Sequence, residues 1–591
     1  MKDKLDKILM QVEKPARYTG GEYNTPDMTK AANLRYCLCF TDIYEVAMSN
    51  LGIAILYDIM NAHPDIICER CFAPWTDLGQ KLKQEDIPLF SLETRTPIKD
   101  FDVIGFSVPY ELSYSNILYM LDLAKIPFRA VDRDENYPLI VGGGPSAANP
   151  EPIIDFFDVF FIGEGEESNI KFCEIVIKHK GDKKRILEEL SGLDGVYVPS
   201  LSTIKDGVCV SKVKKSVVKD LDSASFPKKP LVPNIAIVHD RAVVELYRGC
   251  YAGCRFCQAS FYYRPVRYRE PERVVDIAKT LIKNTGFDEI SLSSLSTGDY
   301  ENIESVILQL REIAEKENVV LQMPSLRLDS FNRELIQNSR LSSLTFAPEA
   351  GTQRLRNVIN KNITDDDIEN SMKTAFEIGY RTVKLYFMLG LPTETDQDVM
   401  GIVDIVKRIR SIYINTTKRR DISINVSTAM FVPKPCTPFQ WAEQISIDEM
   451  IRKQNMLKKE LFYIKGVRYA WHGANDAVLE GMFARGSRQL SYVIESAYNK
   501  GCYFDSWSEH FKPEKWFEAI KENGIDINDF TRARDLNEVL PWDFIDYGVS
   551  KDYLIKEYKK AVEGKVTQAC KFKCNACGAL SLGKCRMAVE I

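Results

Sequence analysis

The sequence predicts an α/β protein with an amino-terminal doubly wound sheet domain, a partial (β/α)6 barrel and a helical extension that ends in a cysteine-rich tail. In two long stretches, 34–200 and 241–444, short apolar runs alternate with helical patterns, which is typical of parallel sheets covered by helices. Two clusters of cysteines mark the start of the second stretch and the end of the chain. With 591 residues, 45% of them hydrophobic, the chain can bury several cores.

Changes in composition divide the chain into six predicted parts. In order they are a polar lead-in (1–33), the doubly wound domain (34–200), a proline-rich linker (201–240), the barrel (241–444), a helical extension rich in aromatic residues (445–550) and a basic tail (551–591). The net charge of −5 argues against broad electrostatic binding of nucleic acid. We find no secretory signal and no apolar run of transmembrane length, so we expect a cytoplasmic protein without a membrane partner.

Five buried strands, with helical patterns between them, predict the doubly wound domain. They are expected at 35–40, 66–72, 103–108, 139–141 and 159–162. Three glycines, Gly142, Gly143 and Gly144, directly follow the fourth strand. Glycines at the carboxyl end of a strand let a ligand approach the backbone, so a binding site is expected at this edge.

Six further strands predict the barrel. They are expected at 242–247, 289–292, 319–323, 343–347, 382–388 and 423–430. Functional residues of such barrels lie at the carboxyl ends of the strands. Because the first cysteine cluster directly follows the first of these strands, we expect the functional site there.

The first cluster consists of Cys250, Cys254 and Cys257, with the spacing C-x3-C-x2-C. Thiolates are soft ligands that suit iron–sulfur clusters, and three of them leave one iron of a 4Fe–4S cluster open for a substrate or cosubstrate. A zinc site would need a fourth ligand, and no histidine lies near in the sequence. The spacing therefore predicts an open 4Fe–4S site.

With Phe256 directly before the last cysteine, this run resembles the signature of the radical S-adenosylmethionine (SAM) superfamily. The resemblance implies that the open iron chelates SAM and that one electron from the cluster cleaves SAM to methionine and a 5′-deoxyadenosyl radical. It also implies that the radical attacks an unactivated carbon of a substrate, which the sequence does not name. A reductant such as flavodoxin or ferredoxin would supply the electron.

Three further turns resemble SAM-binding turns of the same superfamily. After the second strand, Gly298 and Asp299 match a turn whose acid holds the amino group of SAM. After the fourth strand, Glu349 matches a residue that contacts polar groups of SAM or substrate, although it could equally be a carboxylate favoured at a helix start. After the fifth strand, Gly390 and Pro392 match the turn beside the adenine, or simply make a tight turn.

The doubly wound domain resembles the cobalamin-binding-like domain that precedes many radical SAM cores. The matching residues are Asp42, Ser107, Gly142, Gly143 and Gly144. Tyr44 stands where that family has its cobalt-ligating histidine, so cobalt would be unligated from below or cobalamin would be lost. If cobalamin is bound, the resemblance implies methyl transfer. Without it, the domain is a spacer.

Cys436 follows the sixth strand in a proline-rich loop. A thiol close to a radical site could quench a substrate radical or ligate a metal. The alternative is a small buried residue in a rigid loop, and we favour that interpretation.

Four cysteines of the tail, Cys570, Cys574, Cys577 and Cys585, follow the spacing C-x3-C-x2-C-x7-C. Four soft ligands so close together predict a metal site for zinc or for a second iron–sulfur cluster. The tail is locally basic, so a metal knuckle there could grip RNA phosphates. The alternative is a site that only stabilises the fold.

From about Arg17 to Cys585 the chain resembles an uncharacterised bacterial family of radical SAM proteins with an amino-terminal cobalamin-binding-like domain. The leading hypothesis is a radical SAM enzyme that modifies an unactivated carbon, with methyltransferase-like chemistry favoured. Sulfur insertion, as in methylthiotransferases, would need a second cluster on amino-terminal cysteines, whereas the pattern of Cys37, Cys39, Cys68 and Cys71 suggests packing within strands. A metal-dependent RNA- or ribosome-binding factor is the alternative from another class, and RNA could also be the substrate.

Overall fold

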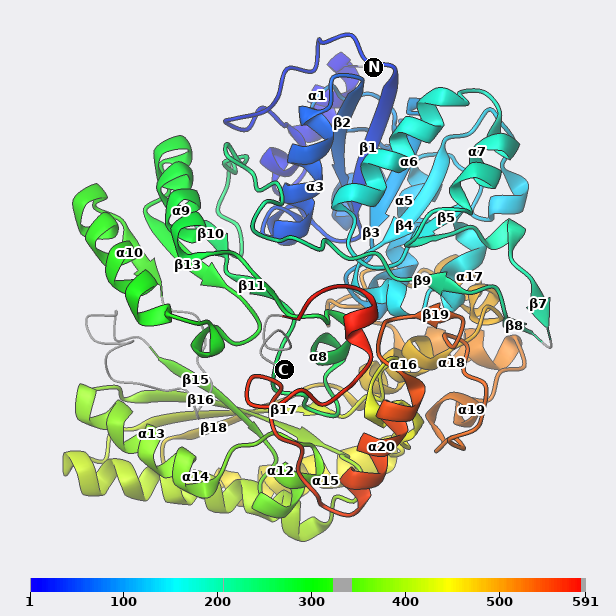
Figure 1. The fold of residues 1–591 in the computed structure, drawn as a ribbon. Helices are drawn as coiled ribbons and strands as arrows, with labels where there is room; N and C mark the ends of the chain where they lie inside the picture. The colour runs from blue at the N-terminus through cyan, green and yellow to red at the C-terminus, as the bar shows by residue number, and fades with distance from the viewer. Residues whose placement is uncertain (1, 206, 323–342, 586–591) are drawn as a thin grey trace.

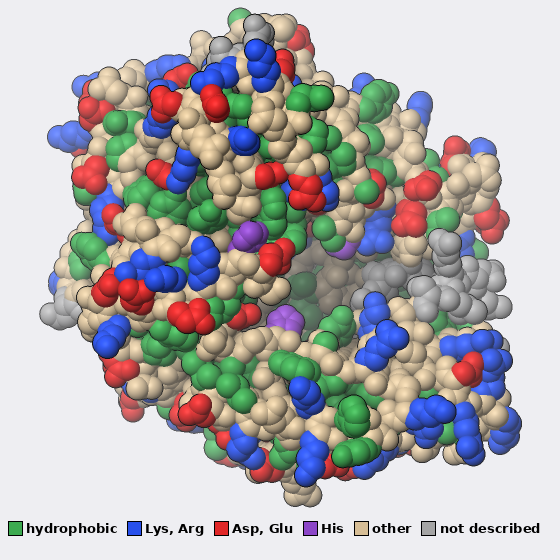
Figure 2. All heavy atoms as spheres, turned by 180° about the vertical axis from the view of Figure 1, so that it is seen from behind, with side chains coloured by type: hydrophobic (Ala, Val, Ile, Leu, Met, Phe, Trp, Pro, Cys, Tyr) green, Lys and Arg blue, Asp and Glu red, His purple; other side chains and the backbone are tan. Residues whose placement is uncertain are grey.

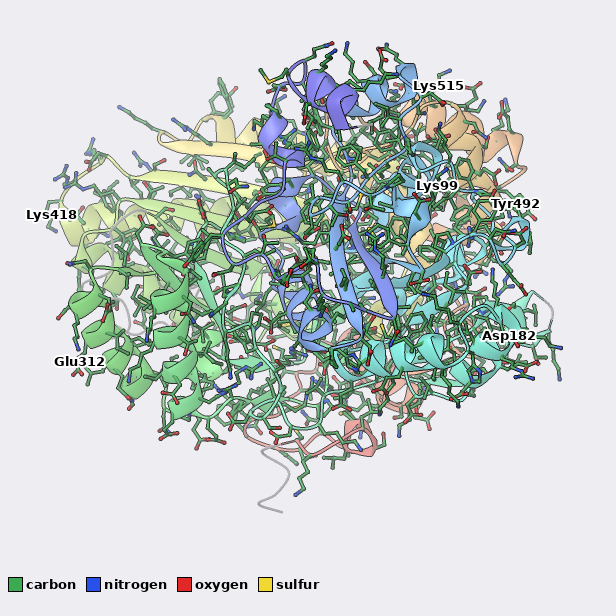
Figure 3. The ribbon with its side chains drawn as sticks, turned by 90° about the horizontal axis from the view of Figure 1, so that it is seen from above. Lys99, Asp182, Glu312, Lys418, Tyr492 and Lys515 are labelled. Carbon is green, nitrogen blue, oxygen red and sulfur yellow. The ribbon has the colours of Figure 1, made fainter. Side chains whose placement is uncertain are left out.

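The computed structural model describes residues 2–205, 207–322 and 343–585. In Figure 1 the amino-terminal domain lies at the top, the barrel at the lower left and the helical extension at the lower right, while the tail, in red, runs through the centre where these parts meet. Seen from above, Glu312 and Lys418 mark the barrel side, and Asp182 and Tyr492 mark the opposite side (Figure 3).

The amino-terminal domain is the doubly wound fold that the sequence predicts. Its strands are β1 (Leu34–Phe40), β2 (Ile66–Phe72), β3 (Val103–Ser107), β4 (Leu139–Gly143), β5 (Val159–Phe161) and β6 (Val196–Tyr197), in the spatial order β2-β1-β3-β4-β5-β6. All pairs are parallel except β5–β6. Both faces of the sheet are buried, one under α3 (Leu51–Ala62) and α6 (Glu166–Lys178) and the other under α5 (Tyr114–Leu123), which explains why the strands read as continuous apolar runs.

The barrel consists of two parallel sheets within the described residues. The first contains β10 (Ala242–Glu245), β13 (Glu289–Ser293) and β14 (Val320–Gln322); the second contains β15 (Leu344–Glu349), β16 (Thr382–Leu389), β17 (Ser423–Met430) and β18 (Val467–Trp471). Helices α9 (Pro271–Thr285), α10 (Ile303–Glu317), α13 (Asp365–Ile378) and α14 (Asp396–Thr417) lie between successive strands in the chain. The six predicted strands are formed, although the last residue of the predicted strand 319–323 lies outside the described residues.

Strand β18 corrects the prediction that residues 445–550 are purely helical. It pairs with β17 in parallel and follows α15 (Ile447–Phe462), so the extension adds a strand–helix unit to the barrel sheet. Its residues alternate between half-buried and exposed, as expected of an edge strand whose weak alternation is hard to detect in a sequence.

The remaining extension helices, α16 (Ala474–Arg485), α17 (Leu490–Asn499) and α18 (Pro513–Glu522), share a hydrophobic core with the amino-terminal domain. On the face shown in Figure 2, acidic and basic side chains are interspersed over most of the surface, and a hollow opens near its centre. Among the described helices, none combines the length and the hydrophobicity that crossing a bilayer would require.

Asp505 fastens the extension to the amino-terminal domain from a fully buried position. Its carboxylate accepts hydrogen bonds from Ser115 Oγ at 2.6 Å and from Trp516 Nε1 at 2.8 Å. Burial raises the pKa of Asp505 to about 6, although both hydrogen bonds act in the opposite direction. The folded protein therefore holds this proton more tightly than the unfolded chain does.

We expect the free energy of unfolding to fall as pH rises from about 4 to about 6, because the Asp505 carboxyl loses its proton over this range. Above it, the ionised carboxylate should lower the free energy of unfolding by about 3 kcal/mol. Asp505→Asn keeps the shape of the side chain but cannot ionise, so its advantage over the wild type should grow across the same window. Urea unfolding at several pH values measures this, with the exposed Asp276→Asn as the control. A difference between wild type and variant that does not change with pH would contradict the raised pKa.

Candidate functional site

The loop that carries Cys250, Cys254 and Cys257 leaves the barrel at the carboxyl end of β10 and runs through β11 (Tyr247–Arg248) to α8 (Gln258–Tyr262). Gly249 has a φ of +94°, and a Cβ there would lie 2.9 Å from the carbonyl oxygen of Tyr263. Only glycine fits this turn without strain, and the turn directs the first cysteine back toward the barrel axis. The sequence prediction for the location of the loop is confirmed.

The three thiols of the loop lie together. Cys250 and Cys254 are 7% and 5% exposed and share a small buried cluster, against which Phe256 and Cys257 pack. Burial and the neighbouring Cys254 and Cys250 raise the pKa of Cys257 to about 11. Buried thiols gathered in this way need a positive centre in order to ionise, so they fit an iron–sulfur cluster.

No three His, Cys, Asp or Glu side chains in the described part of the chain are placed to share a single metal ion. This holds for the loop cysteines and for the tail cysteines alike. In a 4Fe–4S cluster each thiolate binds a different iron, so the ligands of a cluster surround it and do not converge on one ion.

Arg255 and Asn360 fix the cysteine loop from below. The buried Arg255 guanidinium donates to the Val358 carbonyl at 2.9 Å and pairs with Glu557 at 3.1 Å. Asn360 Nδ2 donates to the Gly253 carbonyl at 3.1 Å. The loop is thus held by the barrel on one side and by the carboxyl-terminal helix α20 (Lys551–Val562) on the other.

Asp299 lies at the carboxyl end of β13, where the sequence places the acid for the amino group of SAM. It accepts a hydrogen bond from Ser296 Oγ at 2.7 Å, and its side chain is 8% exposed. Its other partner is the ammonium group of Lys571 from the tail. The ammonium group of Lys571 therefore binds the Asp299 carboxylate, next to Gly298.

The two other predicted turns lie at the carboxyl ends of neighbouring strands. Glu349 ends β15 with a φ of +68° and pairs with Lys361 at 3.1 Å. Gly390 and Pro392 follow β16, and the Gly390 N–H donates to Glu394 at 2.8 Å. Phe256 packs between the cysteine loop and the core under these turns.

A cavity of about 440 Å³ joins the two sheet domains at the carboxyl ends of their strands. From the amino-terminal domain it is lined by Ser107, Gly142, Gly143 and Gly144, and from the barrel by Tyr247, Gly249, Ser293, Ser294 and Leu295. The predicted glycine turn and the start of the cysteine loop therefore face the same space. Pockets of about 300–1,000 Å³ are usual for small ligands.

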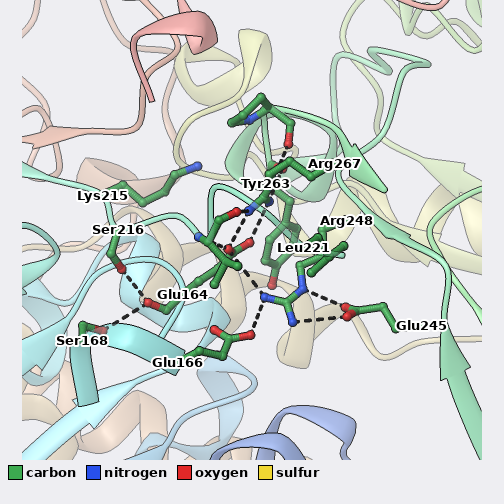
Figure 4. A network of polar contacts seen from close by, with 12 residues as sticks. Glu164, Glu166, Ser168, Lys215, Ser216, Leu221, Glu245, Arg248, Tyr263 and Arg267 are labelled. Atoms are coloured by element: carbon green, nitrogen blue, oxygen red, sulfur yellow. Dashed lines mark hydrogen bonds and ion pairs between the residues drawn. The ribbon is translucent and has the colours of Figure 1, made fainter. Parts of the chain in front are cut away.

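Arg248 fastens the start of the cysteine loop to the amino-terminal domain, as Figure 4 shows. Its guanidinium pairs with Glu166 at 2.5 Å and with Glu245 at 2.7 Å. In the same network Glu164 binds Arg267 through both carboxylate oxygens, at 2.6 and 2.7 Å. Burial would raise the pKa of Glu164, but the two arginines hold it below its ordinary value. The sequence marks the turn containing Glu164 and Glu166 only by its glycines and does not reveal these partners.

Four of the six predicted cobalamin residues, Ser107 and the three glycines, line the interdomain cavity, whereas Tyr44 and Asp42 do not. The Tyr44 hydroxyl is buried and donates to Glu22 at 3.0 Å, and Asp42 accepts a hydrogen bond from Trp507 Nε1 at 3.0 Å. Both lie outside the lining of the interdomain cavity, which holds Ser107 and the three glycines.

Tyr44 is thus committed to a buried partner, and the extension covers Asp42. A cobalamin site that includes Asp42 and Tyr44 stays a prediction, since neither side chain lines the interdomain cavity.

Cys436 is buried with a φ of +60°, and its backbone N–H donates to Gln440 at 3.1 Å. Burial raises the pKa of its thiol to about 12, so it stays protonated at neutral pH. The favoured interpretation of a small buried residue agrees with this position. Cys37, Cys39, Cys68 and Cys71 are likewise buried, on both faces of the β1–β2 pair, as the packing interpretation predicts.

We expect the purified protein to retain no cobalamin, because Tyr44 and Asp42 already have hydrogen-bond partners within the chain. Equilibrium dialysis against hydroxocobalamin, followed by the visible absorbance of the corrin, measures this. Serum albumin serves as the control for unspecific uptake. Stoichiometric binding by the wild type would show that these partners do not exclude cobalamin.

Comparison with known proteins agrees with the site. Residues 52–199 match the family model of the N-terminal region of radical SAM proteins, and residues 244–406 match that of the radical SAM superfamily. An uncharacterized protein of Methanocaldococcus jannaschii is 29% identical over 450 residues, which cover 75% of this chain and 91% of that protein. A tRNA-2-methylthio-N(6)-dimethylallyladenosine synthase of Petrotoga mobilis is 21% identical over 251 residues, which cover 40% of this chain and 56% of that enzyme.

Among solved structures, the radical SAM methyltransferase TsrM of Kitasatospora setae, with cobalamin and a [4Fe-4S] cluster bound, superposes with a TM-score of 0.44. It is 14% identical, and the match covers 67% of this chain and 72% of that one. The matched families span the doubly wound domain and the barrel that holds the cysteine loop. The chain belongs to the radical SAM superfamily of enzymes.

Proposed function

We propose that Cys250, Cys254 and Cys257 hold the 4Fe–4S cluster of this radical SAM enzyme and that the interdomain cavity receives its substrate. The observation that carries the proposal is the packing of two buried thiols and the half-buried Cys257 at the carboxyl end of β10, where the loop borders that cavity. When bound, the cluster supplies one electron to SAM, which yields methionine and a 5′-deoxyadenosyl radical that abstracts hydrogen from an unactivated carbon.

The residues of the chain would orient SAM. The Asp299 carboxylate, oriented by Ser296, would take the amino group of SAM, as it now takes the ammonium of Lys571. Glu349 and the turn of Gly390 and Pro392 lie at the same edge of the barrel and would contact the rest of the cofactor. Arg248 would keep the amino-terminal domain over the site and so exclude water from the radical.

The cavity indicates the size and polarity of the group to be modified. Its volume of about 440 Å³ suits a metabolite, a nucleobase or one side chain, and several apolar side chains line it, Leu38, Phe106 and Phe161 among them. The charged residues at its border are paired with one another in the Arg248 network. We therefore propose a substrate group that is largely uncharged.

Sulfur insertion is the second candidate, because relatives of this chain include enzymes named as methylthiotransferases. These relatives are 21–24% identical to parts of the sequence. One is named for a tRNA modification and the other for ribosomal protein uS12, so RNA as substrate enters this proposal through the first of them. Mass spectrometry of the product separates the two reactions, since a methylthio group adds sulfur and a methyl group does not. The electron donor would be a one-electron reductant such as ferredoxin or flavodoxin.

We expect anaerobically reconstituted protein, with dithionite, to form 5′-deoxyadenosine from SAM. Cys254→Ala should abolish this formation, because the cluster loses a ligand, whereas Cys502→Ala, a buried cysteine outside both clusters, should preserve it. Liquid chromatography of the nucleoside measures both. No product from wild-type protein with a verified 4Fe–4S cluster would reject the proposed function.

Lys571→Met should tighten SAM binding, because the ammonium of Lys571 competes with SAM for Asp299. A partly exposed ion pair contributes up to about 1 kcal/mol, so the dissociation constant should fall by a factor of up to about five. Calorimetric titration of reconstituted protein with SAM measures it, and Lys573→Met, exposed on the same tail, is the matched control. Weaker binding by Lys571→Met would show that the lysine supports the site and does not compete for it.

A further inference from the structure

The carboxyl-terminal tail lies directly against the cysteine loop of the barrel. The Cys570 N–H donates to the Tyr251 carbonyl at 2.9 Å, which is a backbone contact between the two cysteine clusters. The Thr567 N–H donates to Asn360 Oδ1 at 2.7 Å, and Asn360 in turn holds the Gly253 carbonyl. Two N–H groups of the tail thus fix its position against the loop, one through the Tyr251 carbonyl and the other through the side chain of Asn360.

The four tail cysteines lie on a segment whose conformation is fixed by contacts with other parts of the chain. All four cysteines are half-buried, and Asn575 Nδ2 donates to Cys570 Sγ at 3.5 Å. At Gly578 the chain turns with a φ of +102°, and a Cβ there would lie 2.8 Å from the Gly548 carbonyl oxygen. The Cys577 carbonyl accepts a hydrogen bond from the Ser550 N–H at 2.9 Å, so the turn is held at its base.

Arg264 supplies the observation that points to a bound anion. Its side chain is 3% exposed, and its Nε donates to the Ser260 carbonyl at 2.9 Å. Within the described part of the chain, neither Nη1 nor Nη2 makes a well-formed hydrogen bond, although the Cys577 thiol and the Tyr553 hydroxyl lie within side-chain hydrogen-bonding range and Cys570 lies near enough to act on its charge. A Cβ at Gly253 would lie 3.5 Å from Nη2, so the guanidinium sits between the two cysteine clusters.

A buried guanidinium whose neighbours at Nη1 and Nη2 are only a thiol and a phenol is costly unless an anion faces it. The protonated thiols of four cysteines are neutral and accept hydrogen bonds weakly. Four thiolates around a metal centre carry a net negative charge and offer sulfur acceptors to the N–H groups. An anionic metal–thiolate centre beside Arg264 supplies stronger acceptors and a negative charge that balances the guanidinium.

We propose that Cys570, Cys574, Cys577 and Cys585 hold a second 4Fe–4S cluster next to the SAM cluster, with Arg264 donating to its sulfurs. The first three tail cysteines repeat the C-x3-C-x2-C spacing of the barrel loop, and Cys585 supplies the fourth ligand that the loop lacks. The proposal rests on the proposed function, but it concerns different cysteines. The tail cluster can therefore be disproved while the SAM cluster is retained.

The test compares two sets of ligand variants of the full chain after anaerobic reconstitution with iron and sulfide. One variant replaces Cys250, Cys254 and Cys257 by alanine, and the other replaces the four tail cysteines. We expect about eight irons and eight sulfides in the wild type and about four of each in either variant. Cys209→Ala with Cys502→Ala, both buried outside the two clusters, is the matched control and should keep all eight.

Iron, sulfide and zinc analysis, together with electron paramagnetic resonance of the dithionite-reduced protein, reads out the result without any enzymatic activity. If the loop variant binds no iron, or binds one zinc, the second cluster is rejected. If the tail variant binds no iron, the proposed SAM cluster is rejected instead. Thermal unfolding shows whether each variant is folded.

Arg264→Gln, made in the variant that lacks the loop cysteines, provides a readout that depends on the cluster itself. Loss of a buried positive charge makes reduction of a nearby cluster less favourable, so its midpoint potential should become more negative. Arg273→Gln, at a half-buried position of helix α9, is the control. An unchanged potential in Arg264→Gln would place the guanidinium away from the cluster and reject its role.

Discussion

The ion pairs of Arg248 with Glu166 and Glu245 hold the two sheet domains together beside the site, because they join the start of the cysteine loop to the amino-terminal domain. Buried charges of this kind require partners on every side, and here the partners come from both domains. Since the cavity between the domains is bordered by these same residues, its shape depends on the ion network. Two sheets with separate cores thus present their carboxyl ends to one space.

The elements of the fold could be predicted from local patterns. Buried parallel strands read as apolar runs, and the cysteine loop follows the first barrel strand as the spacing implies. Strand β18 was missed because an edge strand with half-exposed residues has little alternation to detect.

The contacts that define the site are long-range, and local patterns do not contain them. Asp42 and Trp507, which meet through a hydrogen bond, are 465 residues apart in the chain. The same holds for Lys571 and Asp299, at a separation of 272 residues. Sequence similarity identified the cobalamin-like loop, but it could not reveal that Tyr44 and Asp42 have hydrogen-bond partners within the chain. The sequence therefore identifies candidate site residues, but it does not show which residues they contact.

The tail contacts also set an order of events during synthesis. Arg255 of the cysteine loop and Lys565, whose carbonyl it binds, are 310 residues apart. At about 5–20 residues per second, the loop leaves the ribosome roughly 15–60 s before its cover does. During that interval the thiols of the loop lack the cover that the tail provides. Enclosure of the loop by the tail therefore comes only after the whole barrel has been synthesised.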